Sequence, residues 1–264
     1  MLSRPAVILS CALFFVAPAR AATCGGDFNA FLSAMAREAA AARMSRSVVG
    51  GLTADGAVLA FDRRQRGTFR KTFEDYAATR VTAPRIKRAK QLMARHATLL
   101  ARIERQFGVP GALLMAIWTL ESDNGSGDMG KLPVIRTIAT LAHDCRRSEL
   151  FQHELIAALQ ILQRGDLSLR DLIGAYAGEI GQTQFLPSSY IKYGIDYDGD
   201  GHVDLRRSVP DVLASTANLL KVNGWRAGAP FGEGSANFEV MREWNRSVIY
   251  RKTLVLFAEQ LTAP

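Results

Sequence analysis

The sequence predicts a mainly α-helical protein, on three observations. Apolar residues recur every three or four positions through most of its 264 residues, as they do on the buried face of a helix. Alternating runs typical of strands are nearly absent, and glycine and proline fall between the helical stretches, where helices end or begin. The chain is long enough to bury one sizeable core, and nothing in it demands two independent domains.

The first 21 residues are typical of a secretory signal peptide. Arg4 precedes an apolar run over residues 6–16, and the small-residue site Ala19-Arg20-Ala21 follows. The apolar run is shorter than the roughly 20 residues needed to cross a bilayer, so we expect cleavage after Ala21 rather than a retained membrane anchor. The mature chain, residues 22–264, is then expected to be exported and soluble.

The net charge and the cysteines can also be interpreted in the light of export. The formal net charge is +8, which in a cytosolic protein would favour nucleic acid. Export instead directs this charge toward an anionic polymer outside the cytoplasm, or leaves a basic surface without a specific partner. Cys11 lies in the leader, so Cys24 and Cys145 remain as a pair, which predicts a disulfide in an oxidising compartment; two buried free thiols are the alternative.

Two helices are predicted in the middle of the chain. Apolar residues repeat every seven positions from Ile86 to Phe107, which predicts one helix over residues 86–107 that Gly108 ends. The next helix, over residues 111–121, is apolar on nearly every side, and a polar, glycine-rich loop follows it.

The same spacing predicts further helices. They cover residues 133–143, 148–163, a stretch beginning at Ser168, 208–223 and 238–261. The spacing of Ser168 to Asp171 fits a capping box. Residues 25–80 break the helical periodicity, and their detail is left open.

Glu121 is the candidate catalytic acid. It follows Ile117 and Trp118 by about one helical turn, which places its carboxyl on an apolar face at the C-terminal end of the predicted helix. Burial and the negative end of the helix dipole both disfavour the charged form there. The group should therefore hold a proton near neutral pH, as a general acid for a glycosidic oxygen must. By spacing alone, a helix-end glutamate that faces solvent is an equal alternative.

Residues 178–190 have the composition of a sugar-binding loop. The glycines let the backbone approach a ligand, Gln182 and Gln184 offer amides with donors and acceptors, and the aromatic side chains suit the faces of sugar rings. Turn-forming residues before a short helix explain half of this pattern without any ligand. Both interpretations stay open.

Residues 196–204 match the opening of a calcium loop of the EF-hand kind. Oxygen ligands stand at the first, third and fifth positions and glycine at the sixth, as Asp196, Asp198, Asp200 and Gly201. The usual acid at the twelfth position is missing, since Arg207 stands there, although Asp211 follows four residues later. The spacing predicts a structural calcium site, with a solvated acidic turn as the alternative.

Four separated motifs are recognisable in this order. They are Trp118-Thr119-Leu120-Glu121-Ser122-Asp123, the run over residues 185–190, the calcium-like loop, and Trp244-Asn245-Arg246-Ser247. Together they resemble the motifs of lytic murein transglycosylases of the B type, over about residues 28–261. The resemblance implies a lysozyme-like catalytic domain with a helical N-terminal extension. It divides the mature chain into a core over about 84–225, a small calcium-loop lobe over about 190–225 and a closing C-terminal helix over about 238–261.

The resemblance also implies an activity and its residues. Members of this family cut the β-1,4 bond between N-acetylmuramic acid (MurNAc) and N-acetylglucosamine (GlcNAc) in peptidoglycan without water, and Glu121 matches their catalytic glutamate. The expected substrate-binding residues are Gln184, Asn245, Tyr250, Tyr76 and Gln182. The expected calcium ligands are Asp196, Asp198, Asp200, the carbonyl of His202, and Asp211. No cofactor is needed for the chemistry, and the expected partner of this periplasmic monomer is the glycan strand, not nucleic acid.

Three positions depart from the family pattern. Ala175 stands where a serine often helps to hold the acetamido group, Leu219 replaces a tyrosine, and Glu179 occupies a position that is often small and apolar. Two alternatives therefore remain. One is a lysozyme-like hydrolase, in which a second carboxylate is chosen from Asp123, Asp128 and Glu179. The other is a catalytically weakened protein that binds peptidoglycan.

Overall fold

The computed structural model describes residues 22–41, 52–64 and 71–263. The expected signal peptide and its cleavage site at Ala21 lie outside these residues. Within them, no helix is both long and apolar enough to cross a membrane.

Most of the described chain is helical, which confirms the predicted class. The α-helices are α1 (Phe28–Ala41), α2 (Gly56–Arg64), α3 (Phe73–Arg80), α4 (Ala83–Arg95), α5 (Ala97–Phe107), α6 (Gly111–Ser122), α7 (Val134–His143), α8 (Ser148–Arg164), α9 (Pro187–Tyr193), α10 (Val209–Val222), α11 (Ala236–Val240) and α12 (Val248–Thr262). A 3-10 helix, η1 (Met241–Glu243), follows α11, and two short strands, β1 (Leu132–Pro133) and β2 (Ile173–Gly174), pair antiparallel.

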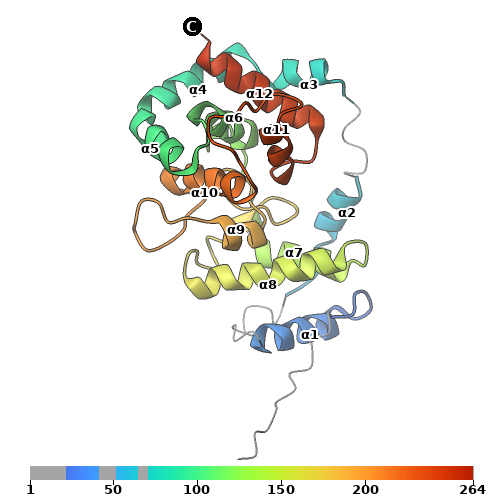
Figure 1. Cartoon of the computed structure of the whole chain (residues 1–264). Helices are drawn as coiled ribbons and strands as arrows, with labels where there is room; N and C mark the ends of the chain where they lie inside the picture. Colours follow the sequence, from blue (N-terminus) through green and yellow to red (C-terminus); the bar gives the residue numbers. More distant parts are fainter. Residues whose placement is uncertain (1–21, 42–51, 65–70, 264) are drawn as a thin grey trace, which may run out of the picture.

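Helix α6 lies in the centre of the upper part of the molecule, in contact with α4, α5, α10 and α12 (Figure 1). Its residues from Gly111 to Leu120 are all buried, and Leu113, Leu114 and Ile117 are fully so. A helix that is apolar all round is stable only inside a core, because no face of it suits water. The continuous apolar run in the sequence thus positions α6, and with it Glu121, at the centre of the fold.

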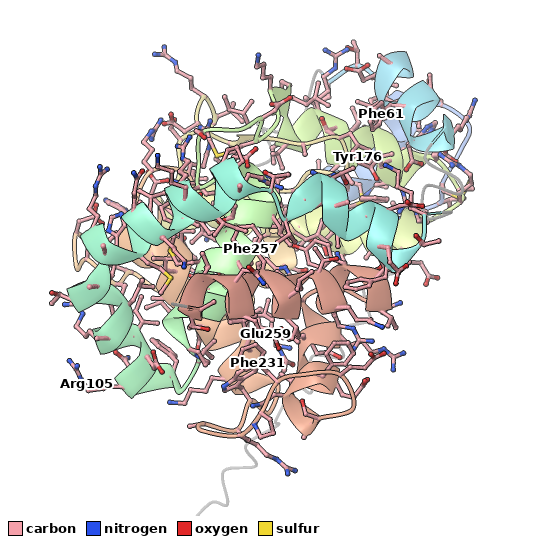
Figure 2. The ribbon with its side chains drawn as sticks, turned by 90° about the horizontal axis from the view of Figure 1, so that it is seen from above. Phe61, Arg105, Tyr176, Phe231, Phe257 and Glu259 are labelled. Carbon is pink, nitrogen blue, oxygen red and sulfur yellow. A yellow bond between two sulfur atoms is a disulfide. The ribbon has the colours of Figure 1, made fainter. Side chains whose placement is uncertain are left out.

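The outer helices are apolar on one face only. On α12, Phe257 is fully buried, whereas Glu259, two residues later, is exposed (Figure 2). Below the α6 region, α7 and α8 pack against each other, and α1 packs against both of them (Figure 1).

The helix predicted over residues 86–107 is in fact two helices. The chain leaves helical geometry at His96, with φ −101° and ψ 17°, between α4 and α5. The seven-residue repeat runs through this point because both helices bury their apolar faces and both contact α6, but α4 also packs on α12 while α5 packs mainly on α10. One straight helix could not reach both sets of neighbours. Gly108 ends α5 in the left-handed conformation (φ 74°), as predicted.

The predicted C-terminal helix over residues 238–261 is also interrupted. The chain forms α11 and η1, turns at residues 244–247 and begins α12 at Val248. Ser247 caps α12 by accepting the amide of Tyr250 (3.3 Å), and Asn245 Oδ1 accepts the amide of Ser247 (2.9 Å). These side-chain bonds stabilise a turn where apolar spacing alone predicted a helix.

No helix starts at Ser168 in the described chain, so that prediction is wrong. Ser168 Oγ does accept the amide of Asp171 (3.2 Å), but the chain enters β2 directly afterwards. Strand β2 pairs with β1, with Gly174 opposite Leu132, and further bridges join Gly174 to Ile180 and Ile180 to Phe185. The cap signal here belongs to a turn, and the bridges fold residues 174–185 into a compact loop beside α6.

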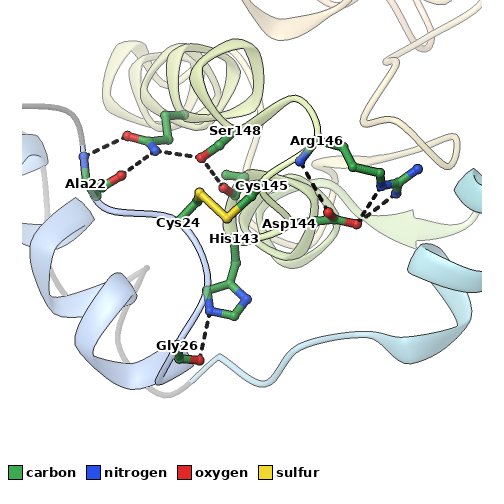
Figure 3. The surroundings of a disulfide bond; sticks show 10 residues. Ala22, Cys24, Gly26, His143, Asp144, Cys145, Arg146 and Ser148 are labelled. Atoms are coloured by element: carbon green, nitrogen blue, oxygen red, sulfur yellow. Dashed lines mark hydrogen bonds and ion pairs between the residues drawn. A yellow bond between two sulfur atoms is a disulfide. The ribbon is translucent and has the colours of Figure 1, made fainter.

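A disulfide joins Cys24 to Cys145, as the sequence predicted (Figure 3). The segment before α1 makes further bonds at the same place: the amide of Gly25 donates to the carbonyl of His143 (2.9 Å), and Ala22 exchanges two bonds with the side chain of Gln152. The N-terminal extension is thereby fixed to α7 and α8.

Ion pairs hold helix α2 in place. Asp62, whose side chain is buried, accepts from Arg146 (2.6 Å) and from Arg147, the two residues that follow Cys145. At the other end of α2, the amide of Asp55 donates to Thr140 Oγ1 (3.0 Å). Two ion pairs to one buried carboxylate leave this helix little freedom to move away from α7.

Candidate active site

Glu121 occupies the last turn of α6, and one of its oxygens accepts two hydrogen bonds. Tyr250 of α12 donates its hydroxyl to Oε1 (2.5 Å), and the indole of Trp244 donates to the same oxygen (3.2 Å). Both donors come from the segment that follows η1, more than 120 residues along the chain. The turn that interrupts the C-terminal helices therefore positions the carboxyl at the end of α6.

The surroundings raise the pKa of Glu121. Burial is the main cause, the donors Tyr250 and Trp244 oppose it, and the nearby charge of Glu179 adds to it. Tyr250 is buried too, and its own pKa lies well above its ordinary value, first from burial and then from the charge of Glu121. The phenol therefore keeps its proton and acts as a donor.

A cavity of about 350 Å³ opens onto Glu121. Its lining combines carboxyl, amide, hydroxyl and aromatic side chains, namely Glu121, Glu179, Glu243, Gln184, Asn245, Thr183, Ser189, Phe185, Leu186, Leu219 and Trp244. Such a mixture of polar groups and ring faces suits a sugar better than an apolar ligand. Of the predicted site residues, the cavity brings together Glu121, Gln184 and Asn245.

Gln184 is presented by a strained turn. Its backbone φ is 56°, in the left-handed region that residues other than glycine rarely adopt. Its Nε2 donates to the carbonyl of Gly181 (2.8 Å), which directs the amide oxygen away from that turn. Gly181 is needed because a Cβ there would lie 2.2 Å from the carbonyl oxygen of Leu205.

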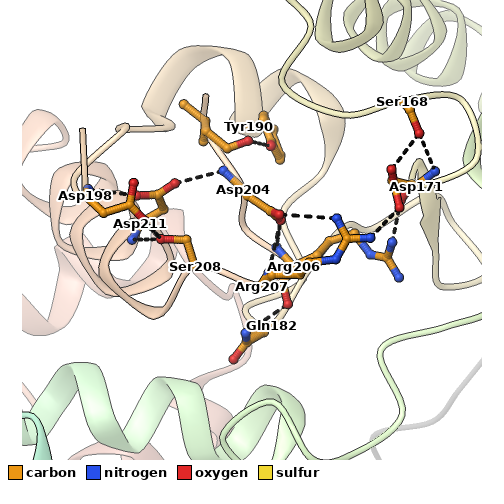
Figure 4. Close-up of polar contacts among 11 residues, drawn as sticks. Ser168, Asp171, Gln182, Tyr190, Asp198, Asp204, Arg206, Arg207, Ser208 and Asp211 are labelled. Carbon is orange, nitrogen blue, oxygen red and sulfur yellow. Dashed lines mark hydrogen bonds and ion pairs between the residues drawn. The ribbon is translucent and has the colours of Figure 1, made fainter. Parts of the chain in front are cut away.

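Gln182 does not line the cavity, contrary to the sequence prediction. Its Oε1 accepts the indole N–H of Trp118 (2.8 Å), and its Nε2 donates to the carbonyl of Arg206 (2.9 Å; Figure 4). Both ends of this buried amide are engaged inside the protein. It ties the 174–185 loop to α6 and to the loop that follows α9, and it is not among the residues that line the cavity.

Tyr250 and Tyr76 also differ from the expected groove aromatics. Tyr250 is buried behind Glu121, so it contacts the acid and not the open cavity. Tyr76 on α3 is half-buried, with the guanidinium of Arg80 5.5 Å from its ring centroid. Burial raises the pKa of Tyr76, and the charge of Glu121 adds to this rise, so the ring lies near the acid although it does not line the cavity.

The calcium-like loop follows α9 and brings three of its predicted ligands together. Carboxylate oxygens of Asp196, Asp198 and Asp211 lie within 4.8 Å of one another. Both oxygens of the buried Asp211 accept backbone amides, from Tyr197 (2.8 Å) and Asp204 (2.8 Å; Figure 4).

The other predicted ligands are not part of this cluster. Asp200 and His202 are exposed, and Asp200 Oδ1 accepts the amide of His202 (2.9 Å). Arg207, at the twelfth position, pairs with Asp171 and lies 3.5 Å from Asp204. The donor set thus fits a hard, oxygen-binding cation at three carboxylates, with Asp211 in place of the usual twelfth residue.

Comparison with known proteins identifies the family. A model of the transglycosylase SLT domain matches residues 27–234. The chain belongs to this family. Membrane-bound lytic murein transglycosylase B of Escherichia coli (strain K12) is 37% identical to this SLT protein over 130 residues, 49% of this chain. The match spans only 36% of that relative's length.

Solved structures share the fold of the SLT protein. SltB3 from Pseudomonas aeruginosa, in complex with NAG-anhNAM-pentapeptide, superposes with a TM-score of 0.83 and 29% identity, over 90% of this chain and 80% of that one. Slt35 from Escherichia coli, solved in complex with calcium, has a TM-score of 0.79 and 22% identity, over 91% and 96% of the two chains.

Sequence reasoning missed the role of Trp244 in this SLT site. Trp244 stands in one of the motifs that carried the resemblance, but only the fold places its indole N–H on the carboxyl of Glu121. The cavity also includes Glu243, which no pattern had singled out, and Thr183 and Ser189, which belong to the predicted 178–190 loop but had been given no individual role. The one signal that could have found these residues is that each lies close in sequence to Asn245 or Gln184.

Proposed function

We propose that the SLT protein is a lytic transglycosylase that cleaves the MurNAc–GlcNAc β-1,4 bond of peptidoglycan strands and forms 1,6-anhydro-MurNAc. The observation that carries the proposal is Glu121, a buried carboxyl with a raised pKa whose Oε1 is held by two donors within a cavity lined by amides. Family membership supports it, as does the anhydro-sugar ligand of SltB3.

In the first step Glu121 is the general acid. Because Tyr250 and Trp244 both donate to Oε1, that oxygen is an acceptor and the carboxyl proton belongs on Oε2. Oε2 gives this proton to the bridging O4 of GlcNAc as the bond from that oxygen to C1 of MurNAc breaks. The resulting carboxylate faces the positive charge at C1, and the two donors stabilise it.

In the second step the same group is the base. The Glu121 carboxylate takes the proton of the C6 hydroxyl of MurNAc while the O6 oxygen bonds to C1. Glu121 ends protonated, as it began, and no water is consumed. One carboxyl therefore serves both steps.

The two cavity amides have complementary orientations. Gln184 uses its Nε2 on Gly181, so it presents an oxygen, which suits the N–H of an acetamido group. Asn245 uses its Oδ1 on the amide of Ser247, so it presents an NH₂ group, which suits a sugar hydroxyl or carbonyl. Since Ala175 has no hydroxyl, we assign these two contacts the main part in positioning the sugar.

A hydrolase would need a second, ionised carboxylate near the scissile bond. Of the three carboxylates named from the sequence, Asp123 is paired with Arg85 (2.6 Å) and Asp128 lies outside the cavity, so Glu179 remains. Glu243 also lines the cavity. Burial raises the pKa of Glu179, which disfavours its ionised form, and its Oε2 accepts the amide of Ala177 (3.0 Å). The raised pKa, which the Ala177 amide only partly offsets, favours internal attack by the C6 hydroxyl.

Mass spectrometry of the products released from purified peptidoglycan tests the proposal. Anhydro ends are one water molecule lighter than the reducing ends left by hydrolysis. We expect anhydro-MurNAc ends; reducing MurNAc ends would assign the protein to the hydrolases. If an excess of the wild-type protein released no sugars, the result would support a binding function instead.

We also propose that calcium binds at Asp196, Asp198 and Asp211, with Asp200 and the His202 carbonyl moving in to complete the shell. The carboxylate cluster and the Gly201 amide bond to Asp196 Oδ2 (2.8 Å) support this. The cation would stabilise the loop and take no part in the chemistry.

The cellular setting is a further part of the proposal. We infer export to the periplasm, cleavage after Ala21, and action as a soluble monomer on peptidoglycan, without nucleic acid. The Cys24–Cys145 disulfide supports an oxidising compartment. N-terminal sequencing and gel filtration of protein from a periplasmic extract test this; a retained Met1 or a stable dimer would contradict it.

A further inference from the structure

Arg85, in the first turn of α4, joins three elements around the catalytic acid. Its Nε donates to Asp123 Oδ1 (2.6 Å), its Nη2 to the carbonyl of Thr119 (2.6 Å) and its Nη1 to the carbonyl of Arg80 (3.0 Å). The side chain of Arg85 is only 17% exposed. A planar guanidinium that is bound at three points is held in one orientation, unlike a cation in a simple surface ion pair.

Two of these three acceptors flank Glu121. Thr119 lies two residues before the acid, and Asp123 lies two residues after it. Asp123 ends α6 in the left-handed conformation (φ 47°), and its amide also donates to the carbonyl of Thr119 (3.0 Å). Arg85 therefore binds the last turn of α6 on both sides of the acid, and its positive charge lies at the negative end of the helix dipole.

The third acceptor, the carbonyl of Arg80, belongs to the last residue of α3 (Figure 1). This helix carries Tyr76, and it packs against α12, which carries Tyr250. Burial is the main cause of the raised pKa of Tyr250, and the charges of Glu121 and Tyr76 add to it, so the three side chains lie close together. Arg85 thus connects the helix of the acid to the helix of the neighbouring tyrosine.

Helix α3 depends on this connection because little of it is buried. Ala77 is the one buried residue among its eight, so the hydrophobic effect contributes little to its position. At its N-terminal end, Lys252 Nζ lies 5.0 Å from the ring centroid of Phe73. At its C-terminal end, the bond from Arg85 to the carbonyl of Arg80 fixes it to α4 and, through the same guanidinium, to α6.

We propose that Arg85 is a positioning residue for the reaction, which holds the end of α6 with Glu121 and the end of α3 with Tyr76 at a fixed separation. The inference rests on the proposed function. Arg85 does not line the cavity, so it acts through these two residues and not on the sugar. A displacement of a reacting group by about 1 Å can cost roughly 10²-fold in rate, so a rigid connection at this place matters for catalysis.

Turnover of purified peptidoglycan tests the effect on the acid. Arg85→Gln removes the charge and the three-point contact, and it should lower kcat by roughly ten- to hundredfold. Arg85→Lys keeps the charge but has no planar fork, so it should restore little of the loss. Arg88→Gln is the matched control, because Arg88 is an exposed arginine one turn further along α4 with no ion pair to any described residue; kcat should not change.

Binding to an inactive variant tests the connection to Tyr76 without relying on turnover. In the Glu121→Gln background, calorimetry would measure the affinity for a peptide-free GlcNAc–MurNAc tetrasaccharide. Arg85→Gln and Tyr76→Ala should each lower it roughly three- to tenfold, and the two together should lower it no more than the larger single loss. The losses from Arg85→Gln and Asn245→Ala should instead add, because Asn245 belongs to the turn before α12 and not to α3.

Two results would overturn the proposal. One is a wild-type kcat for Arg85→Gln, and the other is a loss of affinity that adds to that of Tyr76→Ala, which would leave Arg85 a general role in stability. Melting curves identify variants that do not fold; if Arg85→Gln is one of them, Asp123→Asn, which keeps both carbonyl contacts, replaces it with a smaller loss expected. If the wild type releases reducing MurNAc ends but Arg85 and Tyr76 remain coupled, the proposed reaction fails and the positioning role stands.

Discussion

The two oxygens of Glu121 have different surroundings. Oε1 accepts from Tyr250 and Trp244, and Oε2 is the oxygen that carries the transferable proton in the proposed reaction. Neither donor is charged, so the carboxyl is held in place without a counter-ion that would lower its pKa strongly. Separate variants can therefore test the position of the Glu121 carboxyl and its pKa.

Replacing the carboxyl tests its chemical role. Glu121→Gln keeps the shape and the acceptor Oε1 but has no proton to transfer. General acid–base groups contribute about 10² to 10⁴ in rate, and this one serves both steps, so we expect a loss at or beyond the upper end of that range. The release of soluble sugars from purified peptidoglycan measures it. A folded variant with wild-type rate would refute the assignment, and Glu179→Gln is the matched control, with a much smaller loss expected.

The same variant should be more stable than the wild type, in a way that depends on pH. A carboxyl whose pKa is raised by folding binds more protons in the folded state, so it costs stability as the pH rises above its unfolded value of about 4.3. Glu121→Gln removes that cost. The unfolding free energy of the variant minus that of the wild type should therefore be near zero at about pH 4 and should increase toward about pH 8. Urea titrations at several pH values measure it; a constant difference would contradict the raised pKa.

Removing one donor should shift the pH profile. The hydroxyl of Tyr250 lowers the pKa of Glu121, so Tyr250→Phe should raise that pKa and move the alkaline limb of kcat/KM to higher pH. Loss of a hydrogen bond to a charged group should also lower kcat by roughly ten- to hundredfold. Tyr197→Phe removes a hydroxyl outside the cavity and serves as the control. If the alkaline limb of kcat/KM does not move, a group other than Glu121 governs it.

The sequence allows some residues of the site to be predicted, but not how each one is used. Glu121 could be predicted because its burial follows from the apolar run before it. Gln182 and Gln184 look alike in sequence, and only the left-handed turn at residue 184 sends one amide to the cavity and the other to Trp118. The role of Tyr250 could not be predicted, because its hydroxyl meets Glu121 across 129 residues of chain.

At the scale of elements, local signals located most helices and misplaced their interruptions. Gly108 ended α5 and Ser208 began α10, both as predicted, because a glycine stop and a side-chain cap act within one turn. The break at His96 gave no such signal. It arises because the two halves pack on different helices, which is a tertiary effect that apolar periodicity does not contain.

The disulfide belongs to the same scale, since it fixes the segment before α1 to the end of α7. Replacing Cys24 and Cys145 by serine should lower the unfolding free energy by about 2–4 kcal/mol, because the bond closes a long loop. Urea unfolding with and without reductant measures this, and reductant should leave the double variant unchanged. Cleavage of the shortest strands should persist, as neither cysteine lines the catalytic cavity. Equal stability of the two proteins would show that packing alone holds α1.

At the scale of the whole molecule, the calcium loop packs against the same core as the catalytic helix. Asp211 is fully buried in the first turn of α10, and α10 contacts α6. A cation bound only by the folded state stabilises it by about 2.7 kcal/mol at a hundredfold excess over its Kd, or roughly 5–10 °C in Tm for a chain of this size. Asp198→Asn should abolish most of that shift. A Tm indifferent to both millimolar calcium and chelator would exclude the site.

The two donors on Glu121 also determine when the protein can become active. A ribosome delivers the chain from its N-terminus, so the acid at position 121 is made well before the tyrosine and tryptophan that orient it. Until residues 244–250 have emerged and packed beside α6, the carboxyl has no fixed direction. A partly synthesised or clipped chain that contains Glu121 but lacks this segment is therefore silent. Under the proposed function, the protein acquires its cleaving site only when its last segment has packed beside α6.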